Sequence, residues 1–171
     1  MVAGTPRLCV AQDALTVATP FPVAMGEIEG AVVGARFYVM AGLSPSTGRP
    51  IGAVYVFDAA TNAWTTRNAM PVPSHHIMTT TLNGKIYVFG GFSSPKEFAA
   101  WQPINLSWEY DPATDRWKAL APLPTPRGAG AAVELGGKIY VIGGVQANVP
   151  GNPTTPLGNT TDTPQLVLGT V

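Results

Sequence analysis

The sequence has little of several residue types, and each shortage argues against a class of protein. Its single cysteine, Cys9, cannot form a disulfide within the chain. Charged residues make up only 12% of the 171 residues, and 10 basic residues balance 10 acidic ones, so a nucleic-acid-binding role is not expected. The two histidines, His75 and His76, are adjacent, and no cysteine or carboxylate cluster at zinc spacing accompanies them. No metal site and no cofactor are therefore predicted.

Long apolar runs are also missing. No stretch approaches the ~20 residues of a membrane span, and the most apolar run, residues 30–43, is interrupted by Arg36. The first residues lack the basic region and apolar segment of a signal peptide, and the localisation stays open. In contrast, the chain has 19 glycines, 17 prolines and 46% hydrophobic residues. This composition indicates a β-rich chain with many tight turns and enough apolar residues for a core.

An internal repeat organises most of the chain. Residues 15–42, 64–91 and 117–144 align without a gap, at offsets of 49 and 53 residues. Residues that recur at fixed repeat positions are expected to serve packing and turns. The recurring landmarks are Tyr38, Tyr87 and Tyr140; Gly42, Gly90, Gly91, Gly143 and Gly144; Trp64 and Trp117; and Asp58 and Asp111.

Each repeat is predicted to contain four antiparallel strands, named A to D. In the second repeat they are expected at residues 76–82, 85–90, 106–110 and 117–121. The apolar, β-branched and aromatic runs KIYVFGG and KIYVIGG are typical of strands covered on both faces. Asn83-Gly84 and Gly136-Gly137 favour tight hairpin turns between strands A and B. No helix longer than about two turns is expected between residues 15 and 144.

The paired glycines, the tyrosine four residues before their end, the D-x-A-T-x-x-W turn and the period of ~50 residues resemble the kelch repeat. This resemblance implies an all-β fold, in which each repeat is a four-stranded antiparallel blade of a β-propeller, with strand A innermost. Residues 1–14 are then a degenerate repeat start, and residues 15–144 contain the kelch repeats. Blades are expected at about residues 26–66 and 75–121.

The third repeat is predicted to be incomplete. Strands A and B of this blade are expected at residues 128–144, followed at 145–171 by a long B–C loop and a truncated strand. A D-like strand at residues 15–19 opens the chain without a C partner. Two full blades with partial ones fall short of the four to eight blades of a closed propeller. We therefore expect a fragment that associates with the missing blades of the same propeller and that aggregates when isolated.

Strand parity selects one rim of the propeller for binding. The B–C connections, at residues 43–50, 92–105 and 145–165, are long and irregular, and they emerge at the same end as the D–A connections. His75 and His76 lie at this end and are not required by the repeat. Trp101, with Phe92 and Lys96 nearby, lies in a long loop outside the repeat pattern. These five residues are the predicted binding residues, with the two histidines expected on opposite faces of a strand.

Two functions follow from this pattern. The first is a binding or interaction scaffold that presents its loop rim to a protein or carbohydrate partner, because no catalytic constellation is recognisable and no catalytic residue is assigned. The second is part of a kelch-propeller enzyme acting on carbohydrates, similar to galactose oxidase or a sialic acid epimerase. The first is favoured, since a copper oxidase needs tyrosine, histidine and cysteine ligands from several blades, which this chain does not supply.

Overall fold

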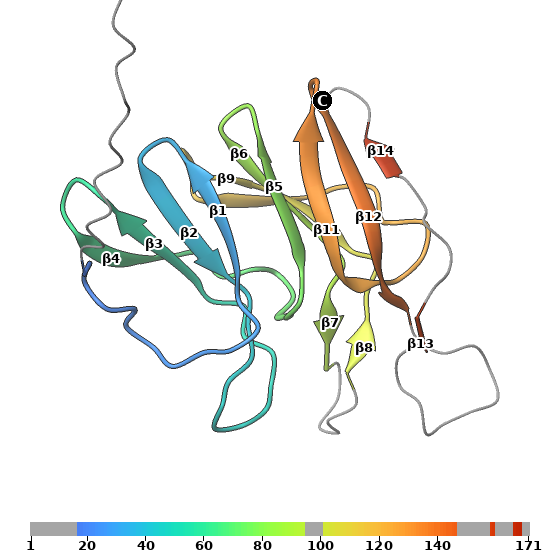
Figure 1. Cartoon of the computed structure of the whole chain (residues 1–171), viewed down its shortest axis with the longest axis horizontal. Helices are drawn as coiled ribbons and strands as arrows, with labels where there is room; N and C mark the ends of the chain where they lie inside the picture. Colours follow the sequence, from blue (N-terminus) through green and yellow to red (C-terminus); the bar gives the residue numbers. More distant parts are fainter. Residues whose placement is uncertain (1–16, 95–100, 147–157, 160–165, 169–171) are drawn as a thin grey trace, which may run out of the picture.

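The computed structural model describes residues 17–94, 101–146, 158–159 and 166–168, and all regular structure within them is β-strand (Figure 1). The strands form three antiparallel sheets that stand side by side as blades 1, 2 and 3, with an additional two-stranded ribbon. The described residues thus form an open, incomplete propeller. The predicted all-β fold class is confirmed, and none of the described residues is helical.

Blade 1 contains four strands that pair in chain order. They are β1 (Glu29–Val33), β2 (Arg36–Met40), β3 (Val54–Asp58) and β4 (Ala63–Arg67). Blade 2 repeats this order with β5 (Met78–Leu82), β6 (Lys85–Phe89), β9 (Ser107–Asp111) and β10 (Arg116–Ala119). The connection between β6 and β9 carries the ribbon of β7 (Phe92–Ser93) and β8 (Gln102–Pro103), which extends from one rim (Figure 1). Each full blade therefore has strands A to D in sequence order.

Blade 3 contains three strands in the A, B and C positions. They are β11 (Gly128–Leu135), β12 (Lys138–Gln146) and β14 (Leu166–Leu168), while β13 (Gly158–Asn159) pairs with the far end of β12. Ile139 pairs with Leu168 as Ile86 pairs with Tyr110 in blade 2, so β14 takes the register of strand C. No fourth strand lies beside β14 within the described residues.

Tight hairpins join the A and B strands at the predicted turns. Leu82 pairs with Lys85 across Asn83-Gly84, and Leu135 pairs with Lys138 across Gly136-Gly137. Asn83, with φ of 53°, has the left-handed backbone that this turn requires. The residues at the equivalent turn positions of the other two blades are glycines with φ of 59° and 62°.

The core lies between the blades. Blades 1 and 2 enclose one cluster, which includes Tyr38, Met40, Ile77, Ile86 and Tyr110. Blades 2 and 3 enclose a second cluster, which consists of Met78, Tyr87, Phe89, Leu123, Ile139 and Val141. Burial of large side chains at these two interfaces supplies most of the hydrophobic stabilisation. Because β6 of blade 2 packs against both neighbouring blades, it reads as a nearly continuous apolar run.

A latch joins the outer edges of consecutive blades. Asn68 lies directly after β4 of blade 1, and its carbonyl oxygen accepts a hydrogen bond of 3.0 Å from the indole N–H of Trp117. Its own backbone N–H donates to Asp115 Oδ1 at 3.0 Å, in the C–D turn of blade 2. The residue that follows a D strand is thus held by the next blade.

The predicted opening strand at residues 15–19 is wrong for residues 17–19, while residues 15 and 16 lie outside the described residues. Residues 17–19 form no strand, because none of the described residues supplies a C strand for them to pair with. Thr19 nevertheless makes the same latch as Asn68. It accepts the indole N–H of Trp64 at 3.0 Å, and its N–H donates to Asn62 Oδ1 at 2.9 Å.

Candidate functional site

The candidate site lies at the rim from which the B–C connections extend. His75 is fixed there by two backbone hydrogen bonds with Phe92, of 3.0 and 2.9 Å, which form an isolated bridge just before β5. The equivalent bridges join Gly26 to Leu43 in blade 1 and Gly128 to Val145 in blade 3. Blade 2 therefore places a histidine where the other two blades have glycine.

His76 has a left-handed backbone, with φ of 50°. Glu27 and Ala129, at the same position of the other blades, have φ of 52° and 58°. This conformation turns the two histidine rings toward each other, with centroids 4.9 Å apart. The expectation that they point to opposite faces is wrong, because it assumes extended backbone at His76.

A hydrogen-bonded chain links three side chains of the site. Glu27 Oε2 lies 2.9 Å from His76 Nε2, and His76 Nδ1 lies 2.7 Å from His75 Nδ1. When His76 is neutral and its Nε2–H donates to Glu27, its Nδ1 accepts a hydrogen bond from His75 Nδ1–H. His75 Nε2 then carries no proton and can only accept. When His76 is protonated, its Nδ1 donates and His75 Nε2 becomes a donor. Protonation of His76 thus reverses the hydrogen-bonding character of His75 Nε2.

His75 is fully buried, and its Nε2 has no hydrogen-bond partner among the residues that the structure describes. Burial, together with the nearby positive charge of His76, lowers the pKa of His75 to about 4, and Glu27 opposes this shift only partly. His75 is therefore neutral near pH 7. Burial also raises the pKa of Glu29, at the start of β1, although the neighbouring His76 acts in the other direction. A buried, unpartnered ring nitrogen is costly unless a ligand or ordered group satisfies it.

Aromatic side chains from the B–C connection cover the histidines. Trp101 meets His75 edge to face, with ring centroids 4.4 Å apart, and its ring stacks on Phe92 at 6.4 Å. The structure thus brings together four of the five predicted binding residues: His75, His76, Phe92 and Trp101. Lys96 lies outside the described residues. The sequence interpretation missed Glu27, whose signal was its repeat equivalence to His76.

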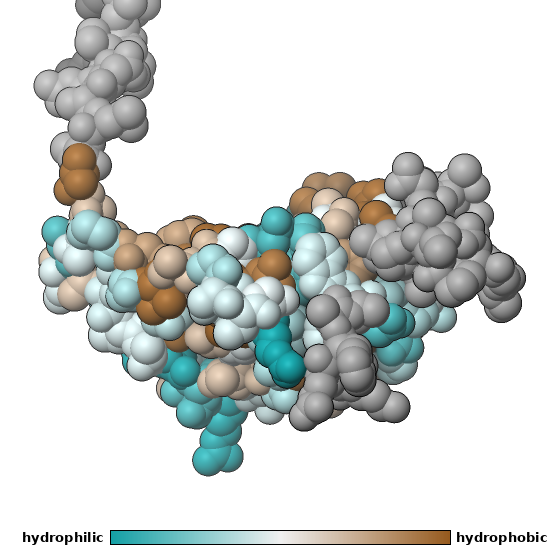
Figure 2. Space-filling view, turned by 90° about the horizontal axis from the view of Figure 1, so that it is seen from below, coloured by the Kyte–Doolittle hydropathy of each residue, from teal (hydrophilic) through white to brown (hydrophobic). Residues whose placement is uncertain are grey.

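A groove adjoins this cluster on the same rim. Arg49, Pro50, Pro73 and Ser93 contribute to its walls, and its volume is about 360 Å³. Ser93 Oγ donates to the carbonyl oxygen of Pro73 at 2.9 Å, which fixes one wall. Figure 2, which shows the molecule from the side of this rim, has hydrophobic and hydrophilic residues intermixed over the surface. The rim combines a shaped groove with a buried polar cluster.

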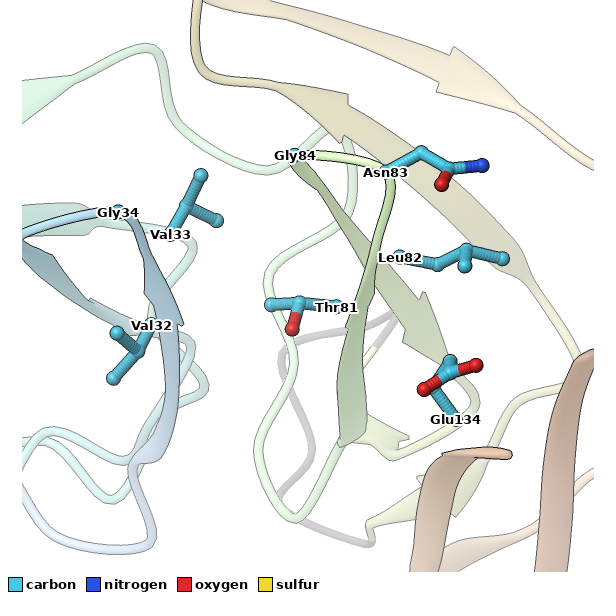
Figure 3. Close-up of a pocket in the computed structure, with 8 residues that line it drawn as sticks. All are labelled: Val32, Val33, Gly34, Thr81, Leu82, Asn83, Gly84 and Glu134. Atoms are coloured by element: carbon cyan, nitrogen blue, oxygen red, sulfur yellow. The ribbon is translucent and has the colours of Figure 1, made fainter. Parts of the chain in front are cut away.

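The opposite rim has a hollow of about 370 Å³ between the A–B hairpins (Figure 3). Val32, Thr81 and Glu134, from three successive A strands, occupy one repeat position in its lining. Glu134 Oε1 accepts the N–H of Gly137 at 2.8 Å and so stabilises its own turn. No histidine or tryptophan is among the described residues that line this hollow, in contrast to the other rim.

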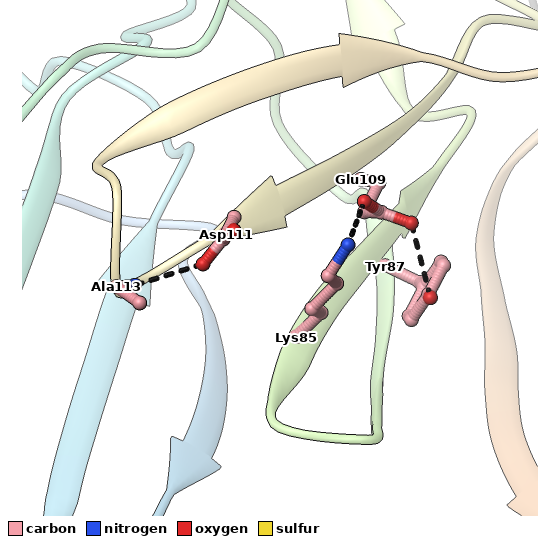
Figure 4. Close-up of polar contacts among 5 residues, drawn as sticks. All are labelled: Lys85, Tyr87, Glu109, Asp111 and Ala113. Atoms are coloured by element: carbon pink, nitrogen blue, oxygen red, sulfur yellow. Dashed lines mark hydrogen bonds and ion pairs between the residues drawn. The ribbon is translucent and has the colours of Figure 1, made fainter.

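Blade 2 also holds a buried carboxylate away from the rim. Glu109 accepts hydrogen bonds from Lys85 Nζ at 2.6 Å and from Tyr87 Oη at 3.1 Å (Figure 4). Burial acts to raise the pKa of Glu109, but these two hydrogen bonds outweigh it and lower the pKa. Burial and the neighbouring Glu109 raise the pKa of Tyr87 to about 12. The three groups satisfy one another, which indicates a structural role.

Neither a metal site nor a membrane-spanning helix is found among the described residues. No group of three or more histidine, cysteine, aspartate or glutamate side chains there is arranged to hold a metal ion. No helix long and apolar enough to cross a membrane occurs in that part of the chain. The Asp58 and Asp111 carboxylates each accept a backbone N–H two residues later, at 3.0 and 2.9 Å, as expected for turn residues. Figure 4 shows the bond between Ala113 and Asp111.

Comparison with known proteins gives consistent matches. The model of the KLHDC2/KLHL20/DRC7 Kelch-repeats domain matches residues 12–157. The chain is 32% identical over 124 residues to Kelch-like protein terF of Aspergillus terreus, covering 70% of this chain and 27% of that protein. It is 45% identical over 71 residues to N-acetylneuraminate epimerase of Pasteurella multocida, covering 40% of this chain and 18% of that enzyme.

A solved structure shares the fold. The structure of YjhT superimposes with a TM-score of 0.65 and 28% sequence identity, over 77% of this chain and 37% of that one. The chain spans 27% and 18% of the length of the two sequence relatives and 37% of this structure.

Proposed function

Because the chain belongs to the kelch-repeat family, we propose that it is a binding module that presents its B–C and D–A rim to a protein or carbohydrate partner. One observation carries this proposal. Blade 2 has two adjacent histidines where the other blades have glycine followed by glutamate or alanine, and both histidines meet a tryptophan from an irregular connection. Residues that depart from a repeat and gather on a loop-bearing rim are characteristic of binding rather than of packing.

The site offers a partner two kinds of contact. Trp101, which is partly exposed above the buried Phe92 and His75, supplies aromatic surface that suits either an apolar side chain or the face of a sugar. Glu27 supplies a half-exposed carboxylate. The neighbouring groove at Arg49 and Pro73 extends this surface.

The open faces of blades 1 and 3 have a second kind of partner in this proposal. Each face carries exposed apolar side chains at repeat positions that are buried in blade 2, and each is suited to a further kelch blade. The partners of the chain thus include the missing blades of its propeller as well as the molecule bound at the rim.

Paired variants test the rim proposal. Immobilised chain carrying Trp101→Ala should lose at least tenfold in affinity for a partner captured by the unaltered chain, while its far-ultraviolet circular dichroism stays unchanged. Thr81→Ala, in the hollow of the opposite rim, is the matched control and should bind normally (Figure 3). Equal binding by the Trp101→Ala chain, or a loss caused by Thr81→Ala, would contradict binding at the B–C rim.

A second candidate is part of a carbohydrate-active enzyme, favoured by the 45% identity over 71 residues to an N-acetylneuraminate epimerase. In that case the histidine pair and Glu27 would contact a sugar. Titration of N-acetylneuraminate into the chain should then shift the His75 and His76 imidazole resonances in a nuclear magnetic resonance spectrum. Unshifted resonances at millimolar sugar would leave the protein-binding function as the better explanation.

A further inference from the structure

Asn83 and Gly84 form the exposed tip of the hairpin between β5 and β6. Both have positive φ, of 53° and 75°, which defines the type I′ turn that an Asn-Gly pair favours. This dipeptide occurs once in the sequence. The A–B turns of blades 1 and 3 contain glycine and alanine only, so the turn of blade 2 is the one that carries an amide side chain.

The side chain of Asn83 differs from those of the other asparagines in its contacts. It has no hydrogen-bond partner within the described structure, and it projects from the tip of the hairpin (Figure 3). The other three asparagines between residues 17 and 146 each use the side-chain amide in a hydrogen bond of 2.8 to 3.4 Å, and they are Asn62, Asn68 and Asn105. The amide of Asn83 is therefore accessible to chemistry from which the others are restrained.

Gly84 supplies an unhindered nitrogen directly after this amide. Its backbone N–H donates to none of the described residues. A Cβ built on Gly84 would meet no atom within 4 Å, so the space around the turn is open. Glycine also has no side chain of its own to obstruct a ring that closes on its nitrogen. A nucleophile and the amide carbon that it can attack are thus adjacent and exposed.

We propose that Asn83 is a site of spontaneous deamidation. The nitrogen of Gly84 attacks Cγ of Asn83. The new N–Cγ bond forms, the Cγ–Nδ2 bond breaks, and ammonia leaves with the proton of the Gly84 N–H. Water then opens the cyclic imide. Cleavage of the N–Cγ bond gives aspartate, whereas cleavage at the main-chain carbonyl carbon gives isoaspartate, whose backbone runs through Cγ. Water is the one other reactant, and asparagine is among the heat-labile residues.

The folded turn controls the rate of ring closure. Closure needs Cγ of Asn83 within reach of the Gly84 nitrogen, and reaction rates depend steeply on such geometry. In the folded hairpin the amide points away from Gly84 (Figure 3). We therefore expect slower conversion in the folded chain than in a free peptide of the same sequence. Conversion at Asn62 should be slower still, because its side chain is bonded to Thr19 and alanine follows it.

The two products should affect blade 2 differently. Aspartate tolerates a left-handed backbone in this chain, since Asp115 has φ of 54° in the C–D turn. Isoaspartate adds a methylene group to the main chain, so the turn can no longer join Leu82 and Lys85 in their present register. The strand that follows the turn carries the buried Ile86 and Tyr87. Isoaspartate should therefore destabilise the blade, whereas aspartate should not.

Both products also change the charge of one rim. The 10 basic and 10 acidic residues of the chain balance, so either product leaves it with a net negative charge. The new carboxylate lies in the lining of the hollow that also includes Glu134 (Figure 3). This rim is opposite to the candidate binding site, so the inference is independent of the proposed binding function.

Peptide mapping by mass spectrometry tests the site. After incubation of the full chain in mildly alkaline buffer, the peptide that contains Asn83 should gain the mass difference between an amide and a carboxyl group. The peptides that contain the other three asparagines named above should keep their mass. The turn peptide of Asn83→Gly, which has the glycine found in blade 3, should also keep its mass. An unchanged Asn83 peptide after a free peptide of the same sequence has fully converted overturns the proposal, as does earlier conversion at Asn62.

Methyl transfer and urea unfolding test the isoaspartyl product. An isoaspartyl methyltransferase with S-adenosylmethionine should label the aged chain, but neither fresh Asn83→Asp nor aged Asn83→Gly. The isoaspartyl form, isolated by anion-exchange and hydrophobic-interaction chromatography, should unfold at a lower urea concentration than Asn83→Asp. An aged chain that accepts no methyl group overturns the formation of isoaspartate at this turn. Equal urea midpoints of the two forms overturn the predicted loss of strand register.

Discussion

Replacement of Gly90 by alanine tests how tightly blade 3 is seated on blade 2. Gly90 has φ of 55°, and a methyl group built on it would overlap the carbonyl oxygen of Arg127 in the connection that enters blade 3. That same oxygen accepts the N–H of Gly91 at 2.8 Å. The methyl group therefore has to displace a backbone acceptor that is already used between the two blades.

The expected loss has two parts. The left-handed backbone costs a residue with a Cβ about 1–2 kcal/mol. Displacing the Arg127 carbonyl breaks a buried hydrogen bond, which costs a further 1–3 kcal/mol or so. We expect Gly90→Ala to lower the free energy of unfolding by about 3–4 kcal/mol. Gly136→Ala is the matched control, since Gly136 has φ of 62° with no atom within 4 Å of a Cβ, and should cost only the first part.

Urea unfolding followed by tryptophan fluorescence measures both variants. Ala41, at the same repeat position of blade 1, is buried with φ of 59°, which shows that blades 1 and 2 are seated to accept a methyl group. If Gly90→Ala proves no worse than Gly136→Ala, blades 2 and 3 adjust in the same way, and the reasoning from close approach is refuted.

Three further predictions concern buried polar groups and the latch. Because the pKa of His75 is about 4 in the folded chain and ordinarily 6.5, the unfolded chain binds more protons between these pH values. The free energy of unfolding should therefore fall by about 3 kcal/mol as the pH drops from 7 to 4. Urea unfolding of His75→Gln should lack this pH-dependent loss. Glu109→Gln should cost about 1–3 kcal/mol by calorimetry, because Lys85 loses its charged partner; a change no larger than that of Glu134→Gln would contradict this. Trp64→Phe should lose the latch hydrogen bond and about 1 kcal/mol, with faster hydrogen exchange at Thr19 as the readout.

The repeat predicted the fold because each of its landmarks has a local physical cause. Asn83-Gly84 specifies a left-handed hairpin turn, and KIYVF specifies a strand covered on both faces, so the sheet follows without knowledge of distant contacts. The prediction of a strand at 15–19 failed for residues 17–19, because local sequence does not specify whether a neighbouring strand is present. A strand needs a paired neighbour, and the residues that pair with it are not supplied by the described part of this chain.

The sequence predicted which residues form most of the candidate site but not how they contact one another. His75, His76, Phe92 and Trp101 were selected because the repeat does not require them, and the structure brings them together. The contact between the two rings was missed, because it depends on a backbone conformation at His76 that histidine rarely adopts. Glu109 was missed because a lone carboxylate inside an apolar strand gives no sign of whether it will be paired.

The left-handed residue at the start of each A strand has an evolutionary consequence. Glutamate, histidine and alanine all occupy this position with nearly the same φ, at 52°, 50° and 58°. The backbone there is imposed by the blade and is insensitive to the side chain that it carries. Mutation can therefore exchange an acid, a base or a methyl group at this rim, one blade at a time, without rebuilding a loop. The chemistry of this rim can in this way change while the backbone of the blade keeps its conformation.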